Sequence, residues 1–171
     1  AEASGVTCVA FDYRLAPEHR FPVAVDDAVA AYRALLRDGY TANRIVIAGD
    51  SAGGGLALAA IAALRDSGDA LPAAGVCLSP WTDLAMTGAS IDAKAPEDPL
   101  LAPWELHAFV RQYLNGADAR NSLASPLYAD YRGFPPLLIH VGDAEVLRDD
   151  STRLAQRARV SCSSSGLIRK S

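Results

Sequence analysis

Short apolar runs alternate with helical patterns along this sequence, and no other feature constrains its fold as strongly. The runs are rich in β-branched residues, as buried strands are, and most segments between them repeat apolar residues every three or four positions. Strands that alternate with helices form a mostly parallel sheet with right-handed crossovers, so we expect an α/β fold with helices flanking the sheet. The predicted strands are residues 6–11, 44–48, 74–78 and 137–141, and the predicted helices are residues 22–36, 56–64, 104–114 and about 150–159.

The composition is that of an ordinary globular chain and does not favour polyanionic partners. Its 171 residues suffice for one domain with a core, and the net charge of -4 argues against nucleic acid or a polybasic membrane patch. No apolar run approaches the roughly 20 residues that cross a bilayer, so we expect no membrane span.

The cysteines form no metal-binding or disulfide pattern. Their number is odd and no C-x-x-C spacing occurs; Cys8 and Cys77 lie within apolar runs, so we expect both side chains to be small buried hydrophobes, while Cys162 lies near the serine-rich end. This usage fits a reducing cytoplasm. H-E-x-x-H and Cys/His clusters are also missing, and we expect neither a metal nor an organic cofactor.

A glycine-rich turn, Gly49-Asp50-Ser51-Ala52-Gly53, joins the second predicted strand to an apolar helix. A serine in this setting is typical of a nucleophile elbow, in which the serine adopts strained dihedral angles. We expect the two glycines to relieve a clash between strand and helix, and the Ala52 amide to stabilise an oxyanion. The alternatives are an inert turn and a phosphate loop; the second is weak, because G-x-G-x-x-G and a Walker lysine are absent and Asp50 would repel an anion.

Four motifs occur in the order seen in one known family: "YRLAPEHRFP", "GDSAGGGLA", "LSPWTDL" and "SPLYADYRGFPPLLIHVGDAEVLRDDS". From Gly5 to about Arg159 the chain resembles bacterial hormone-sensitive-lipase-like esterases, which are α/β-hydrolases. The resemblance implies Ser51 as the nucleophile and Glu145 as the catalytic acid. Asp143 stays open as a rival acid, and a solvated acidic loop is the non-functional alternative.

The resemblance also predicts a histidine base after the acid, because this fold orders its triad as serine, acid, histidine. His19, His107 and His140 all precede Glu145, and we expect none of them to be the base. Relatives carry an upstream H-G-G-G segment that is absent here as well. We therefore expect a fragment: residues 1–160 would form the central part of one α/β-hydrolase domain, with a partial parallel sheet, and residues 161–171 an atypical tail without native-like structure.

The expected function follows from this resemblance. The parent would hydrolyse short- to medium-chain carboxylic esters, lactones included, and this chain itself would be inactive. Asp50 and Trp81 are assigned to substrate binding, the loop at Asp83 to the pocket rim, and Asp149 or Asp150 to capping the last helix. The partner would be a small-molecule ester, with a homodimer as an option for the full-length parent. The alternatives are a non-catalytic binding protein similar to the plant gibberellin receptor and a peptidase of the same fold.

Overall fold

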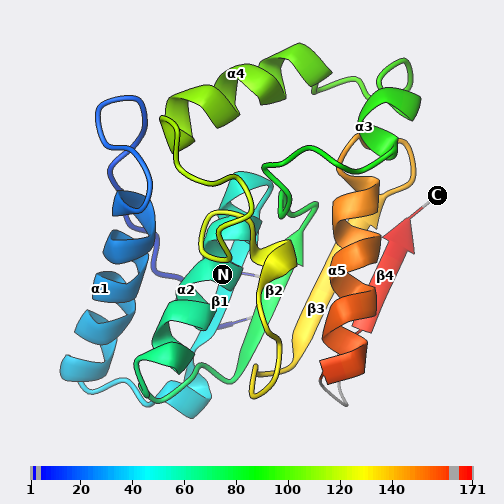
Figure 1. Ribbon diagram of the computed structural model, residues 1–171. Helices are drawn as coiled ribbons and strands as arrows, with labels where there is room; N and C mark the ends of the chain where they lie inside the picture. The colour runs from blue at the N-terminus through cyan, green and yellow to red at the C-terminus, as the bar shows by residue number, and fades with distance from the viewer. Residues whose placement is uncertain (1, 3–4, 162–165, 171) are drawn as a thin grey trace.

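Four parallel strands form one sheet in the order β1-β2-β3-β4 (Figure 1). The computed structural model describes residues 2, 5–161 and 166–170. Hydrogen bonding aligns the strands so that Ala48 pairs with Val76, and Val76 with Leu138. The strands are β1 (Val46–Asp50), β2 (Ala74–Leu78), β3 (Leu137–Gly142) and β4 (Gly166–Lys170).

The three long helices α1, α2 and α5 lie on the same face of this sheet (Figure 1). Helix α2 packs on β1 and β2, α5 packs on β3 and β4, and α1 packs against α2. Helix α4 crosses above the carboxyl ends of the strands, where the site described below lies (Figure 1). The helices are α1 (Val23–Arg37), α2 (Ala52–Asp66), α3 (Ser90–Ala93), α4 (Pro103–Leu114) and α5 (Arg148–Ser161), with short 3-10 turns at Ala42–Arg44 and Pro126–Tyr128.

The core lies between the sheet and α2 and α5. Leu58 and Ile61 of α2, Ile139 of β3 and Leu154 of α5 are all completely buried in one cluster. Helix α2 is apolar nearly all round because α1 covers the side that faces away from the sheet. The predicted strand–helix alternation is therefore confirmed from α1 through α5, with boundaries shifted by a few residues.

The opposite face of the sheet is uncovered within the described residues. Every second strand residue points to that face, and Val46, Leu78 and Leu138 are 51%, 43% and 41% exposed. Parallel sheets ordinarily have both faces covered, and their strands carry apolar residues on both faces. An uncovered face therefore exposes apolar side chains to an unusual degree.

The prediction of a strand at residues 6–11 is wrong. This segment has no regular structure, and Val6, Val9 and Phe11 are exposed. A strand needs a hydrogen-bonded neighbour, and no described segment pairs with residues 6–11. Cys8 is consequently exposed rather than buried, whereas Cys77 is completely buried as expected; Cys162 lies outside the described residues.

The chain end also differs from the expectation. Residues 166–170, predicted to belong to a tail without native-like structure, form β4, whose backbone pairs in parallel with β3. The open edge of β3 offers unpaired N–H and C=O groups, and an adjacent extended segment satisfies them. Within the described residues, no helix is long and apolar enough to cross a membrane.

Candidate active site

Ser51 occupies a sharp bend between β1 and α2. Its φ of 52° and ψ of -118° lie outside the regions that serine ordinarily adopts, as expected for a strained elbow. The Ser51 N–H donates to Leu78 O at 2.9 Å, and Ser51 O accepts from the N–H groups of Gly54 and Trp81 at 3.0 and 2.9 Å. These backbone hydrogen bonds fix the bend to β2 and to the loop that follows it.

The glycines around this bend do not all have the same role. A Cβ at Gly49 would lie 2.1 Å from Gly53 O, so the strand and the helix approach too closely for any side chain there. At Gly53 a Cβ would meet nothing within 4 Å, and the expectation that Gly53 relieves a side-chain clash is wrong. Gly54 and Gly55 are the other constrained positions: a Cβ would lie 2.8 Å from Pro80 Cβ at the first and 2.2 Å from Trp81 O at the second. The sequence signalled them only as a run of glycines.

The first amides of α2 are available to an anion. Among the described residues, the Ala52 N–H has no hydrogen-bond acceptor, while the amides of Gly54 and Gly55 donate to Ser51 O. The positive end of the helix dipole adds to the attraction for negative charge at this point. A negatively charged oxygen that forms next to Ser51 would find both contributions in place.

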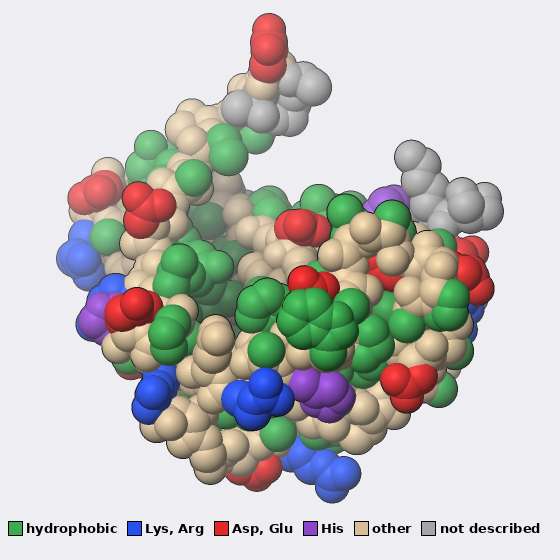
Figure 2. Space-filling model, turned by 90° about the horizontal axis from the view of Figure 1, so that it is seen from above, with side chains coloured by type: hydrophobic (Ala, Val, Ile, Leu, Met, Phe, Trp, Pro, Cys, Tyr) green, Lys and Arg blue, Asp and Glu red, His purple; other side chains and the backbone are tan. Residues whose placement is uncertain are grey.

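A cavity of about 380 Å³ opens beside Ser51. Figure 2, seen from above the strand ends, shows the hollow with hydrophobic side chains gathered around it. Its walls come from the loop before α1, the elbow, the loop after β2, and α4 with its flanking loops. The main apolar contributors are Leu15, Leu56, Trp81, Leu84, Leu101, Leu106, Phe109, Val110, Tyr113 and Leu123. Burial in this wall raises the pKa of Tyr113 to about 12.

The predicted site residues separate into two groups. Ser51, Ala52 and Trp81 line the cavity, and Trp81 is mostly buried. Asp50 is exposed at the end of β1 and lies outside the cavity lining. Asp83 is completely buried and does not line the cavity either.

Glu145 and Asp143 lie on the loop after β3, which we call the acid loop (residues 143–147). Glu145 Oε1 accepts a hydrogen bond from the Gly142 N–H at 2.8 Å. The elbow follows β1 and the acid loop follows β3, so only β2 separates them at the same edge of the sheet. Two strand spacings amount to about 10 Å, which leaves room for an imidazole between the serine and the acid.

Asp149 and Asp150 do not cap α5, contrary to expectation. The helix begins at Arg148, before either residue, and both carboxylates bind loops instead. Asp149 Oδ2 accepts from the Ser90 N–H at 3.0 Å, and Asp150 Oδ2 accepts from the N–H groups of Thr82 and Asp83 at 2.7 and 2.8 Å. Both carboxylates therefore hold loops at the strand ends.

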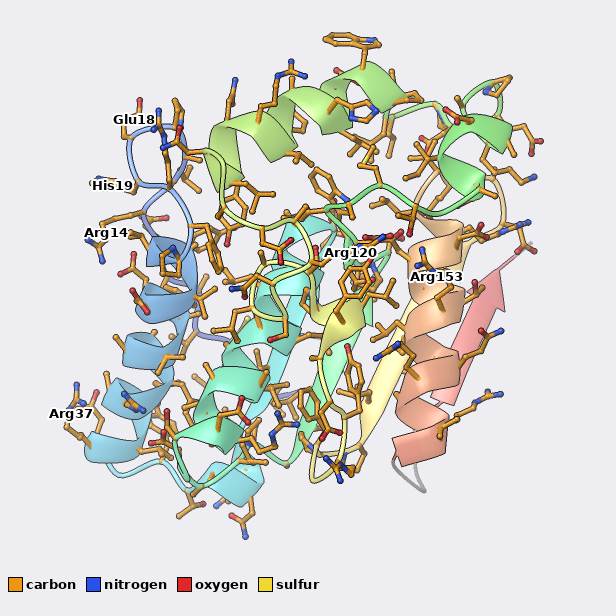
Figure 3. The ribbon with its side chains drawn as sticks, in the orientation of Figure 1. Arg14, Glu18, His19, Arg37, Arg120 and Arg153 are labelled. Carbon is orange, nitrogen blue, oxygen red and sulfur yellow. The ribbon has the colours of Figure 1, made fainter. Side chains whose placement is uncertain are left out.

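The pKa values of the two buried carboxylates at this junction are shifted in opposite directions. Burial raises the pKa of Asp150 to about 7, and its Oδ1 has no partner among the described residues. Burial also opposes ionisation of Asp83, but hydrogen bonds from Thr87, Tyr128 and Arg153 outweigh it and lower the pKa of Asp83. Arg153 projects from α5 to make this contact at 3.0 Å (Figure 3).

Among the described residues, no histidine lines the cavity. His19 lies exposed at the outer edge of the loop before α1 (Figure 3), His107 is exposed on α4, and His140 lies within β3 on its uncovered face. The structure thus places Ser51 and the Ala52 amide beside an apolar cavity, while Glu145 lies after β3 at the same edge of the sheet and outside the cavity lining.

A parallel α/β sheet with a strained serine bend between a strand and a helix is typical of the α/β hydrolases, and the comparisons with known proteins show this class. The family model described as alpha/beta hydrolase fold matches residues 1–167, so the chain belongs to that family. An acetyl-hydrolase of Streptomyces hygroscopicus is 52% identical over 157 residues, which are 92% of this chain and 52% of the relative.

Solved structures agree with this assignment. An esterase from the bacterial hormone-sensitive lipase family superposes with a TM-score of 0.90 at 50% identity, over 92% of this chain and 53% of that structure. The esterase EstE5, in a crystal soaked with p-nitrophenyl butyrate, matches with a TM-score of 0.90 at 49% identity and the same coverage. The chain spans about half the length of these relatives.

Proposed function

We propose that this chain forms the nucleophile and acid half of a carboxylic ester hydrolase. The observation that carries the proposal is Ser51 itself, held in the elbow conformation at the edge of an apolar cavity. Beside it lies the Ala52 amide, which has no acceptor among the residues that the structure describes. Family membership supports it, since the matched relatives are named as an acetyl-hydrolase and esterases.

The reaction would be acyl transfer to water through a serine ester. Ser51 Oγ attacks the ester carbonyl and loses its proton to a general base, and the Ala52 N–H stabilises the oxyanion. The base returns that proton to the leaving alcohol and then activates water for the second half-reaction. In this class the base is a histidine that follows the acid, and the three histidines of this chain all precede Glu145.

Glu145 is the proposed acid, in preference to Asp143. The hydrogen bond from Gly142 to Oε1 fixes the Glu145 carboxylate at the end of β3, next to the strand that separates it from the elbow. No described hydrogen bond or ion pair holds the carboxylate of Asp143. The role of the acid is to orient the histidine and to stabilise its charged form.

The substrate would be an ester with a short- to medium-chain acyl group. A cavity of about 380 Å³ is at the small end of ligand sites, and its largely apolar wall suits a hydrocarbon chain. Trp81, in the wall beside the elbow, is the proposed contact for the substrate. Butyrate esters, of the kind with which the EstE5 crystal was soaked, are suitable first substrates.

A chimaera tests this function. The 157 aligned residues of this chain would replace the corresponding stretch of the Streptomyces hygroscopicus acetyl-hydrolase, which would then supply the remaining segments. We expect hydrolysis of p-nitrophenyl acetate and butyrate, with a loss on the order of 10⁴ to 10⁶ in kcat for Ser51→Ala. A folded chimaera without esterase activity, or with activity that survives Ser51→Ala, would overturn the proposal.

The two acids are compared in the same chimaera. Glu145→Gln should lower kcat on the order of 10⁴, whereas Asp143→Asn should change it little. The 171-residue chain alone should show no hydrolysis that depends on Ser51, because it lacks a histidine after the acid. Tight binding of an uncleaved small molecule by the chimaera would instead favour the non-catalytic alternative.

A further inference from the structure

The segment that leads into α4 is hydrogen-bonded to the acid loop at several points. Ser90 Oγ donates to Val146 O at 2.6 Å and accepts from the Asp149 N–H at 3.0 Å. Asp98 Oδ2 accepts from the Val146 N–H at 2.8 Å. Two stretches that are about 50 residues apart in sequence therefore hold one another at the carboxyl end of β3.

These contacts fix the backbone immediately after Glu145. The Val146 N–H belongs to the peptide bond that Glu145 begins, and Val146 is completely buried. With Asp98 on the N–H and Ser90 on the carbonyl, both peptide groups of Val146 are held. The direction in which the Glu145 side chain leaves the backbone depends on that peptide.

The second oxygen of Asp98 reaches the cavity wall. Asp98 Oδ1 accepts from the N–H groups of Leu100 and Leu101 at 2.9 and 3.1 Å, and Leu101 lines the cavity beside Ser51. One carboxylate thus joins the loop of the proposed acid to the wall of the proposed acyl site. The bonds to Leu100 and Leu101 form an ordinary local turn, but the bond to Val146 spans 48 residues and has no local explanation.

We propose that Asp98 is a positioning residue. Through its hydrogen bond to the Val146 amide it fixes the position of the Glu145 carboxylate relative to the acyl pocket. The proposal rests on the proposed esterase function. A carboxylate suits this position because both of its oxygens act as acceptors, whereas an asparagine would turn an N–H₂ group toward one set of amide donors.

The test is a double-mutant cycle in the chimaera. Asp98→Ala should lower kcat about 10- to 100-fold with a smaller change in KM, because a displaced acid weakens the transition state more than substrate binding. The acid limb of the pH–kcat/KM profile should shift to lower pH, since a misplaced carboxylate stabilises the histidinium less. In the Glu145→Gln background, Asp98→Ala should have no further effect. An equal loss in both backgrounds, or no loss in either, would refute the positioning role.

A second measurement examines the contact without relying on catalysis. In the 171-residue chain, Asp98→Ala should speed hydrogen exchange at the Val146 amide, because that amide loses its acceptor. Asp92→Ala is the matched control: Asp92 lies in α3 of the same segment, is exposed, and makes no described side-chain hydrogen bond to the acid loop. Unchanged exchange at Val146 in the Asp98 variant would refute the proposal even if the chimaera is inactive. An inactive parent chimaera would refute the esterase function itself.

Discussion

At the scale of single residues, the position of one carboxylate oxygen depends on the absence of a neighbouring side chain. A Cβ at Gly142 would lie 2.6 Å from Glu145 Oε1, the atom that the Gly142 N–H now holds. The clash involves the end of a flexible side chain, so the carboxylate can rotate away. We expect Gly142→Ala to lower kcat of the chimaera about 10-fold or more, with little change in Tm. A Tm loss that accounts for the activity loss would contradict this prediction.

The buried acid Asp150 predicts a pH dependence of stability. An unfolded aspartate titrates near pH 3.9, whereas burial raises the pKa of Asp150 to about 7 in the folded chain. Its contribution to stability is complete below about pH 4 and is lost as the pH rises through about 7, because the unfolded chain gives up its proton first. As the pH rises from 4 to 7, the urea midpoint of the wild-type chain should therefore decrease relative to that of Asp150→Asn.

The Asp150→Asn comparison also provides its own control. Hydrogen bonds from Arg14 and Arg132 lower the pKa values of Asp27 and Asp130 to about 2, so the contributions of these two carboxylates change with pH in the opposite sense. Both are the same in the two proteins, so only the difference between wild type and variant reports on Asp150. Parallel midpoint curves for the two proteins would show that Asp150 does not titrate in this range.

At the scale of elements, helix α2 offers a matched pair of glycines. Gly53→Ala meets open space, and alanine's better helix propensity should raise the free energy of unfolding by about 0.5 kcal/mol. Gly55→Ala places a Cβ 2.2 Å from the backbone oxygen of Trp81, so the helix must move, and we expect a loss of about 2 kcal/mol or more. Urea unfolding of the two variants measures both. Equal effects would show that the close approach of α2 to Trp81 does not limit this helix.

The elements were predictable to the degree that their signals were local. Helix α1 and strand β2 follow directly from the spacing of apolar residues and from β-branched content. Residues 6–11 carry the same strand signal but pair with no segment that the structure describes, and residues 166–170 become a strand because the edge of β3 lies beside them. Strand pairing is a property of two segments, and the pattern of one segment does not contain it.

At the scale of the whole molecule, the described residues leave one face of the sheet covered by helices and the other uncovered. Leu138 and Ile139 are neighbours in β3 with opposite orientations, the first 41% exposed and the second completely buried. Leu138→Thr, combined with Val46→Thr, should reduce self-association and binding of an apolar dye, with little loss of stability. Ile139→Thr should instead cost about 2–4 kcal/mol. Light scattering and dye fluorescence test the double variant of Val46 and Leu138, and urea unfolding tests the Ile139→Thr control. Unchanged self-association of the double variant would show that this face does not cause self-association.

The sequence by itself determined the α/β class, the elbow at Ser51 and the family, because these depend on local patterns and on motifs in a fixed order. It also predicted the strand at residues 137–141, after which Glu145 lies. Only the tertiary structure decided which glycines are constrained, which segments enclose the cavity, and that Asp98 contacts Val146. Those facts depend on atoms from segments far apart in the chain coming within a few ångströms, and the geometry of packing fixes such distances only after the chain has folded.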